Sequence, residues 1–213
     1  MIKNIFFDFD GVIAESVNIK TEAFKQMYIR YGKKIASKVV KHHMENGGIS
    51  RFEKFKIYQD WLGLENSPSK ISELSLQFSE IVMQGVIDAP EVKGTSSFLE
   101  NYCNHYRRWI ISGTPTEEMI EIVSKRKLGK YFTGIYGSPK KKQEWTEYII
   151  NRWNLTRTET IFVGDAGSDH DAAIESGILF ILRKTEENFM LFKNFTGPRI
   201  NDLTQLHEVL SIF

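Results

Sequence analysis

The stretch Ile5–Ile13 reads Ile-Phe-Phe-Asp-Phe-Asp-Gly-Val-Ile and decides the fold of this chain. Its apolar start, Ile5–Phe7, predicts a buried strand that ends on two acids at positions i and i+2, Asp8 and Asp10. Gly11 permits a sharp turn directly after them. Both carboxylates can then face one crevice beyond the strand, where parallel sheets bind ligands, and a divalent cation would relieve their repulsion. Taken alone, the stretch fits equally well a strand followed by an Asp-Gly turn in which Asp10 only helps the bend.

Three later segments settle that choice by their order along the chain. Trp109–Gly113 is an apolar run that ends on a serine and a glycine, Gly137–Pro139 leads into Lys140–Lys142, and Ile161–Asp169 ends on two acids. Together with Asp8–Val12, these segments resemble the four motifs of the haloacid dehalogenase-like (HAD) superfamily of phosphohydrolases: Asp-x-Asp-Gly-Val, a strand-end Ser or Thr, a lysine, and Gly-Asp-x-x-x-Asp. The resemblance spans nearly the whole chain.

The resemblance implies roles for the acids. Asp8 would be the nucleophile and form an aspartyl-phosphate intermediate, while Asp10 would protonate the leaving alcohol and then activate water. Mg²⁺, which suits an all-oxygen site, would be bound by Asp8, by Asp10 through its backbone carbonyl, and by Asp165. Asp169 would belong to the same metal site without contacting the ion, because it would orient the metal ligands or the lysine. The family spacing directs Asp171 to solvent.

The second motif is expected to bind the phosphoryl group. The Ser112 hydroxyl and the Gly113 N–H can donate hydrogen bonds to phosphoryl oxygens at a strand end. Without its neighbours the segment fits a simple strand-to-helix turn, with Thr114 or Thr116 capping the helix.

A lysine is expected to neutralise the phosphate and hold Asp8. Lys140, Lys141 and Lys142 are adjacent candidates, and the Lys-Pro pair of many family members is absent. We favour Lys142 because it stands directly before a helix expected from Gln143, which leaves the other two as solvated charges.

Composition sets limits on class and partners. A chain of 213 residues with 41% hydrophobic and 26% charged residues is ordinary for a globular protein. A net charge of +1 disfavours nucleic-acid and membrane partners. The single cysteine, Cys103, cannot form an internal disulfide, and we expect it to be a small buried apolar side chain. With no apolar run of about 20 residues, we expect a cytoplasmic protein that is a monomer or a weak dimer.

An all-helical insertion is expected between the first two strands. Residues 15–90 contain helical patterns only, such as the apolar stripe Phe24, Met27, Tyr28 and Tyr31, and they interrupt the alternation of strand and helix. The resemblance implies that this insertion is a cap that chooses the substrate. Arg51, close to its Gly47–Ser50 turn, is the candidate specificity residue, with a plain surface arginine as the alternative.

From Glu91 onward, strands and helices alternate, which indicates a parallel sheet with right-handed crossovers. We expect a helix over Thr95–Tyr106 and irregular surface chain over Glu186–Pro198. The fold class is therefore α/β: a Rossmann-like parallel sheet (residues 1–14 and 91–213) with an inserted all-helical cap domain (residues 15–90).

The expected function is Mg²⁺-dependent hydrolysis of a small phosphorylated metabolite, a phosphomonoester. A phosphomutase of the β-phosphoglucomutase type shares all four motifs and is the nearest alternative. Family mutases of that type carry a histidine in the first cap segment, and an ungapped count puts Lys20 there, which is unsuited to shuttling a proton at neutral pH. A haloacid dehalogenase would lack the acid at Asp10. A non-catalytic binding protein is disfavoured because all four motif acids are present.

Overall fold

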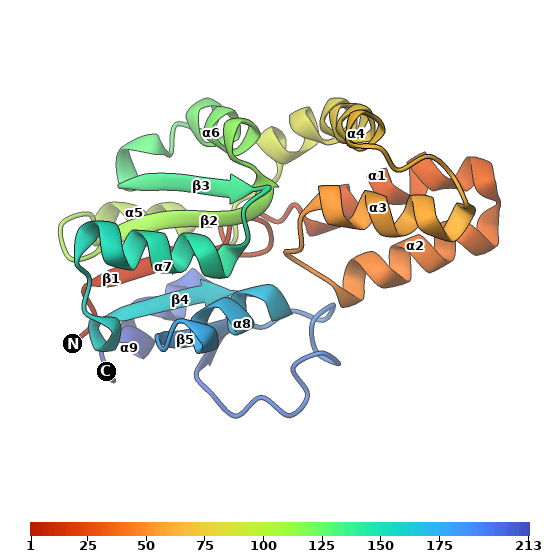
Figure 1. Cartoon of the computed structure of the whole chain (residues 1–213). Coiled ribbons are helices and arrows are strands. Elements are labelled where there is room, and N and C mark those ends of the chain that lie inside the picture. Colours follow the sequence, from red (N-terminus) through yellow and green to blue (C-terminus); the bar gives the residue numbers. More distant parts are fainter.

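The computed structural model describes residues 1–213, and its centre is a six-stranded sheet in the order β3-β2-β1-β4-β5-β6 (Figure 1). All neighbouring strands are parallel. The first strand lies in the middle, so the direction of chain progression reverses beside it, and this is where open parallel sheets bind ligands. The strands are β1 (Asn4–Phe7), β2 (Arg107–Pro115), β3 (Gly134–Ser138), β4 (Thr160–Gly164), β5 (Leu179–Arg183) and β6 (Arg199–Ile200).

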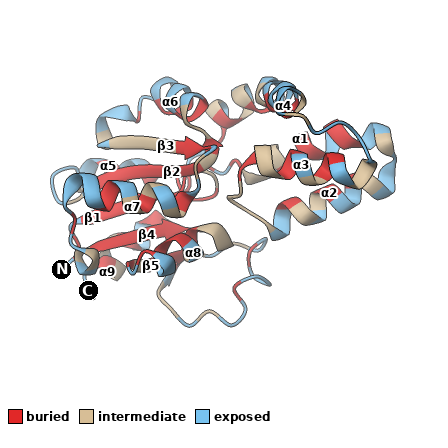
Figure 2. Cartoon of the chain, in the orientation of Figure 1, coloured by how far each residue is buried: buried red, intermediate tan, exposed pale blue.

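Helices cover both faces of the sheet. The alternation of side chains along β1 sends Ile5 and Phe7 to one face and Phe6 to the other. The first face packs against α5 (Thr95–Asn101), α6 (Thr116–Lys125) and α9 (Leu206–Leu210), and the second against α7 (Lys142–Trp153) and α8 (Gly167–Glu175). On the second face the Phe6 ring meets the Trp109 ring edge-on at 5.5 Å. Figure 2 shows the central strands buried, β3 at intermediate burial along most of its length, and the covering helices exposed on their outer sides.

Four helices form an insertion ahead of α5 in the chain between β1 and β2, and the α/β fold is confirmed as predicted. They are α1 (Val17–Tyr28), α2 (Lys33–Glu45), α3 (Arg51–Leu62) and α4 (Pro68–Asp88). They lie beyond the carboxyl ends of the strands, at the opposite end of the sheet from both chain termini (Figure 1). We call them the helical unit. Local capping bounds two of its helices, since Ser50 and Ser67 cap the starts of α3 and α4 and the left-handed Gly63 ends α3.

Aromatic packing holds the helical unit together. The ring of Phe24 from α1 lies 4.4 Å from that of Phe78 on α4, 5.5 Å from Phe55 and 5.7 Å from Tyr58 on α3. These side chains belong to the same continuous apolar cluster as the first face of the sheet. The helical unit is therefore packed on the sheet domain through a shared apolar core.

Two connecting segments join the helical unit to the sheet and run side by side. The Glu15 N–H donates to Pro90 O at 2.9 Å, and the Val92 N–H donates to Ile13 O at 3.0 Å. Beside them, the Arg126 guanidinium at the end of α6 donates to the carbonyls of Val86, Ile87 and Ala89. These are carbonyls that the end of α4 leaves without helical partners, so Arg126 fixes that end to the sheet domain.

Three local expectations were wrong. Cys103 is exposed, because α5 ends at Asn101 and the chain around Cys103 turns at the surface instead of continuing as helix to Tyr106. The segment 186–198 is irregular but only partly surface: Asn188 and Phe192 are buried. A two-residue strand, β6, follows it and pairs with β5. No helix combines the length and apolar character needed to cross a membrane.

Candidate active site

The end of β1 brings Asp8 and Gly11 against the end of β4. The Asp8 N–H donates to Val163 O, which continues the pairing of the two strands. Gly11 has φ +79°, and a Cβ there would lie 2.2 Å from Asp165 Oδ2. Only glycine fits this backbone conformation and this close approach without strain. The sharp turn after the first motif is thus also the place where the Asp165 carboxylate lies.

Lys142 is the one lysine of its run that lies in the acid cluster. Its Nζ is 2.8 Å from Asp8 Oδ2 and 2.5 Å from Asp169 Oδ1, and all three side chains are buried. Lys141 is the exposed N-cap of α7, and the Lys140 ammonium lies over the Trp145 ring. Burial disfavours a charged Lys142, but Asp169 and Asp8 outweigh it and raise the pKa of Lys142, so this lysine is a fixed cation.

Asp169 is fully buried and serves to position other groups. Its Oδ2 accepts hydrogen bonds from the N–H groups of Asp165 at 3.2 Å and Ala166 at 3.0 Å, while Oδ1 accepts from Lys142. Both oxygens therefore hold the β4–α8 turn and the lysine. Asp171, two residues on, is exposed, as expected.

The carboxylates of Asp8, Asp165 and Asp169 fit a divalent cation. One oxygen from each lies within 4.8 Å of the others. Burial, followed by the charge of Asp169, raises the pKa of Asp8 to about 7. Burial and the charges of Asp8 and Asp169 likewise raise the pKa of Asp165. Crowded oxygen donors that resist ionisation form a site that a hard cation would stabilise.

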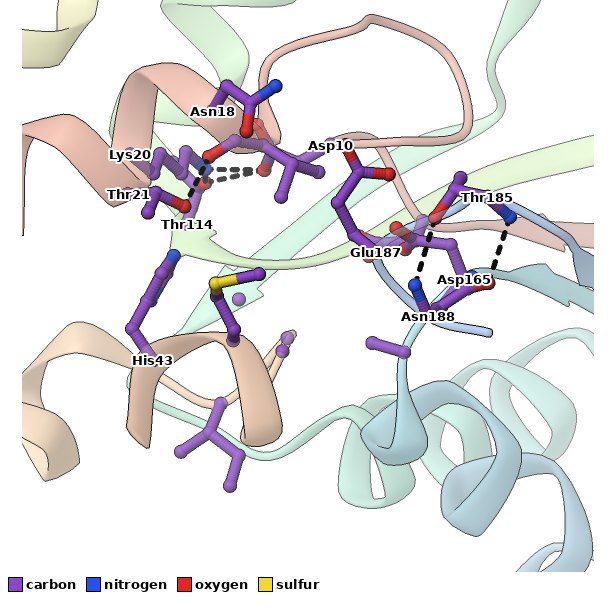
Figure 3. Close-up of a pocket in the computed structure, with 18 of the residues that line it drawn as sticks. Asp10, Asn18, Lys20, Thr21, His43, Thr114, Asp165, Thr185, Glu187 and Asn188 are labelled. Atoms are coloured by element: carbon purple, nitrogen blue, oxygen red, sulfur yellow. Dashed lines mark hydrogen bonds and ion pairs between the residues drawn. The ribbon is translucent and has the colours of Figure 1, made fainter. Parts of the chain in front are cut away.

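Asp10 faces a different set of partners from Asp8. It accepts a hydrogen bond from Ser16 Oγ at 2.6 Å. It also accepts hydrogen bonds from Thr114 Oγ1 at 3.3 Å and from the Lys20 ammonium (Figure 3). Lys20 also donates to Thr114 at 2.5 Å. Burial opposes ionisation of Asp10, but the Lys20 charge and the Lys20 and Ser16 hydrogen bonds lower the pKa of Asp10 overall. The side chain of Asp10 is therefore held as a carboxylate beside the cluster.

The end of β2 lies under a glycine loop of the helical unit. Ser112 is buried and its Oγ accepts from the Thr114 N–H at 3.1 Å. A Cβ on Gly113 would lie 2.4 Å from Gly48 O, so the two backbones nearly touch. Neither Thr114 nor Thr116 caps α6: β2 continues to Pro115, and the Thr116 hydroxyl accepts from the Gly137 N–H. The alternative interpretation of this segment, a turn in which Thr114 or Thr116 caps the following helix, is therefore wrong about the cap.

Arg51 lines the cavity below the helical unit, but its guanidinium has partners already. Nη2 lies 2.6 Å from Glu118 Oε1 on α6, and Nη1 donates to Ser79 Oγ and Ser75 O on α4. Both charged side chains are buried. Arg51 thus joins the helical unit to the sheet domain, and a role in substrate selection remains a prediction.

A cavity separates the helical unit from the carboxyl ends of the strands and the turns that follow them, which we call the sheet edge. Asp8, Asp10 and Asp165 line one side, and Lys20, His43 and Lys54 line the other. Asn188 closes a third side, where its amide donates to Asp165 O at 2.8 Å (Figure 3). The sequence contained no motif for His43, Lys54 or Asn188, and Lys20 was identified only by counting from the first motif.

Comparison with known proteins agrees with this geometry. A family model described as haloacid dehalogenase-like hydrolase matches residues 5–182. Phosphoglycolate phosphatase 1 of Pseudomonas aeruginosa is 23% identical over 188 residues, 82% of this chain and 66% of the relative, so the chain spans slightly less than two thirds of that relative. Phosphorylated carbohydrates phosphatase of Thermotoga maritima is 24% identical over 184 residues, 82% of this chain and 81% of the relative. The crystal structure of β-phosphoglucomutase from Clostridium difficile superposes with a TM-score of 0.78 at 16% identity and covers 100% of this chain and 98% of the other.

Proposed function

The chain belongs to the haloacid dehalogenase-like hydrolase family, and we propose that it is a Mg²⁺-dependent phosphatase that hydrolyses a small phosphomonoester. The observation that carries this proposal is the Asp8 carboxylate. It is oriented by the Phe9 N–H at 2.7 Å and by Lys142 at 2.8 Å, and it faces a cavity. The names of the curated relatives, both phosphatases, support the same reaction.

In the first step, an Asp8 oxygen attacks phosphorus and the bond from phosphorus to the leaving oxygen breaks. This step requires the protonated form of Asp10, which gives its proton to that oxygen, and the oxygen leaves as an alcohol; the proton that Asp10 takes from water in the second step restores this form. Lys142, together with Ser112 Oγ and the Gly113 N–H, would bind the phosphoryl oxygens. Because Lys142 is already held by Asp169, it needs no rearrangement to take this position.

In the second step, water attacks the phosphorus of the aspartyl-phosphate. Asp10 accepts the proton of that water, the bond between phosphorus and Asp8 breaks, and phosphate is released. The Lys20 ammonium lowers the pKa of Asp10 against the effect of burial, and this favours the carboxylate form that the second step needs.

Asp8, Asp165 and the Asp10 carbonyl would hold Mg²⁺, with Asp169 orienting them. A bound Mg²⁺ supplies positive charge to the phosphoryl oxygens and relieves the repulsion between the carboxylates. The chemistry of the donor set supports this choice of metal, since every donor is an oxygen.

We also propose that residues 15–90 form the cap domain and that residues 1–14 and 91–213 form the catalytic domain. The paired connecting segments at Glu15 and Pro90 support this division. A cytoplasmic location, a monomeric or weakly dimeric state, and the absence of nucleic-acid and membrane partners are further proposals. They are supported by the net charge of +1 and the single cysteine.

A phosphomutase remains the second candidate because of the fold shared with β-phosphoglucomutase. Lys20, the residue at the expected position of the mutase histidine, is bound to Asp10 and Thr114. A lysine in this contact is a poor proton shuttle at neutral pH, so Asp10 is left to activate water. This favours hydrolysis.

The test measures phosphate release from a panel of phosphorylated short acids, sugars and nucleotides, with Mg²⁺ present and after chelation. Hydrolysis of one class with Mg²⁺ is the expected result. A parallel ³¹P NMR experiment supplies a hexose 1-phosphate with a trace of the bisphosphate. Accumulation of the 6-phosphate without inorganic phosphate would assign the protein to the mutases instead.

A further inference from the structure

Lys54 is a buried cation without a carboxylate partner. It is 2% exposed and makes no ion pair, whereas buried Arg51 makes one and buried Lys142 makes two. Its Nζ lies 2.9 Å from His43 Nδ1, its only other hydrogen-bond partner is the His43 carbonyl at 3.5 Å, and the Phe24 ring centroid lies 5.8 Å away. A buried charge without a counter-ion is unfavourable by several kcal/mol. An apolar side chain of the same length would avoid that penalty, so Lys54 requires another explanation.

His43 presents a second donor beside Lys54. Because its Nδ1 faces the lysine ammonium, the neutral ring carries its proton on Nε2, and that nitrogen has no hydrogen-bond partner in the protein. Burial and the Lys54 charge lower the pKa of His43 to about 2, so the ring stays neutral. Figure 3 shows His43 reaching from α2 toward Lys20 and Thr21 of α1.

Both side chains line the same cavity as Asp8 and Asp10. Burial, with the charges of Lys20 and Lys142, lowers the pKa of Lys54 to about 7, so the three ammonium groups act on one another electrostatically. Lys20 is neutralised by Asp10, and Lys142 by Asp8 and Asp169. Lys54 is the lysine of this group that lacks a counter-charge, and an anion in the cavity would supply that charge and stabilise the protonated form of Lys54.

We propose that Lys54 and His43 form a second anion site in the cavity, and that the substrate carries a second anionic group, a carboxylate or another phosphate, away from the phosphate that is cleaved. The inference that this ligand is the substrate rests on the proposed phosphatase function. The inference that the site binds an anion rests on Lys54 and His43 alone.

The test compares esters that differ in the second anion only. 3-Phosphoglycerate and glycerol 3-phosphate differ by a carboxylate, and glucose 1,6-bisphosphate and glucose 6-phosphate differ by a phosphate. In one of the two pairs, we expect kcat/KM to be higher for the ester that carries the second anionic group. Lys54→Met should reduce that preference about tenfold. The pair that responds tells a carboxylate from a phosphate. Lys56→Met, an exposed lysine on the same helix, is the matched control and should keep the preference.

His43→Phe, which keeps a ring but loses the Nε2 donor, should reduce the preference by a smaller factor. Equal preference within both pairs, or a preference that survives Lys54→Met, would overturn the anion site even if the protein is a phosphatase.

Binding separates the two proposals. Calorimetric titration of folded Asp8→Asn protein with 3-phosphoglycerate and with the bisphosphate needs no turnover. If Lys54→Met weakened the binding of either ligand about tenfold while the wild-type protein hydrolysed no ester of the panel, the phosphatase would be rejected and the anion site supported. Binding unaffected by Lys54→Met would reject the anion site.

Discussion

The sheet edge and the helical unit face each other across one cavity with opposite charge. The strand ends, the turns after them and the first residues of α7 and α8 contribute four aspartates and a single buried lysine. The helical unit contributes Lys20, Lys54 and His43. Backbone geometry fixes the sheet edge, because each acid follows a buried strand. The donors of the helical unit depend on contacts between helices.

This contrast suggests that the sheet edge and the helical unit have different roles. The sheet edge holds groups whose mutual distances a reaction at phosphorus requires, and the strands fix them rigidly. The helical unit holds groups that would contact the remainder of a substrate. The two regions should therefore respond differently to substitution, the first in kcat and metal binding and the second in selectivity and stability.

Replacement of Asp8, the proposed nucleophile, should have the largest effect and should be confined to the sheet edge. Asp8→Asn keeps the shape of the side chain but removes the attacking carboxylate, so kcat should fall about 1000-fold or more with the melting temperature maintained. Steady-state kinetics with p-nitrophenyl phosphate measures this loss, with exposed Asp171→Asn as the control. Substantial turnover by folded Asp8→Asn protein would contradict a covalent mechanism.

Metal dependence should be the next largest effect. Chelation should abolish activity, and Asp165→Asn should raise the Mg²⁺ concentration needed for half-maximal activity about tenfold or more. A Mg²⁺ titration of both proteins gives these values. If the chelated protein retained full activity, the carboxylate cluster would have another purpose.

Arg51 tests whether the two regions are coupled mechanically. Arg51→Met alone leaves Glu118 buried without its partner and should lower the unfolding free energy by about 3 kcal/mol. The double variant Arg51→Met/Glu118→Leu should recover most of this loss. Urea unfolding measures stability, and KM for the best substrate is measured in parallel. A KM that changes strongly in the stable double variant would support the specificity role predicted from the sequence, whereas an unchanged KM would make Arg51 structural.

Lys54 should produce the smallest change, and one that depends on pH. Below pH 7 both folded and unfolded Lys54 are protonated, and the folded protein bears the full penalty of the buried charge. Between pH 7 and 10.5 the folded lysine is neutral while the unfolded one still holds its proton, so wild-type stability rises with pH.

Lys54→Met should therefore be the more stable protein at pH 6, and its advantage should shrink by about 2 kcal/mol between pH 7 and pH 9. Urea unfolding at several pH values measures this difference, and Lys56→Met corrects for every other titrating group. An advantage that does not change with pH would mean that Lys54 keeps its charge when folded.

Sequence patterns predicted the sheet domain well, because its determinants are local. Ile5–Phe7 and Ile161–Val163 are apolar runs that become β1 and β4, and the acids after them lie together because parallel strands end at one edge. Ser50 and Gly63 bound α3 as capping chemistry requires. Lys142 was favoured because a helix was expected from Gln143, and α7 begins one residue earlier, at Lys142 itself.

The contacts that were missed depend on tertiary structure. Lys54 lies between buried Arg51 and Phe55 on α3, but a lysine on an amphipathic helix ordinarily indicates an exposed face. His43 comes from a different helix, and no periodicity links the two. Asn188 lies in irregular chain, where its burial arises from hydrogen bonds to the carbonyls of Asp165 and Arg183.

Because Arg126 attaches one end of α4 to the sheet domain, a rotation at that end would produce a larger displacement at the other end of the helix. Its 21 residues extend about 30 Å from the fixed end near Asp88 to Pro68. A rotation of about 10° at the fixed end would move the far end by about 5 Å. Since α1 and α3 both pack on α4, the whole helical unit would follow that arc. A small angular change at the Arg126 attachment would thus appear at the far end of the helical unit as a displacement of several ångströms.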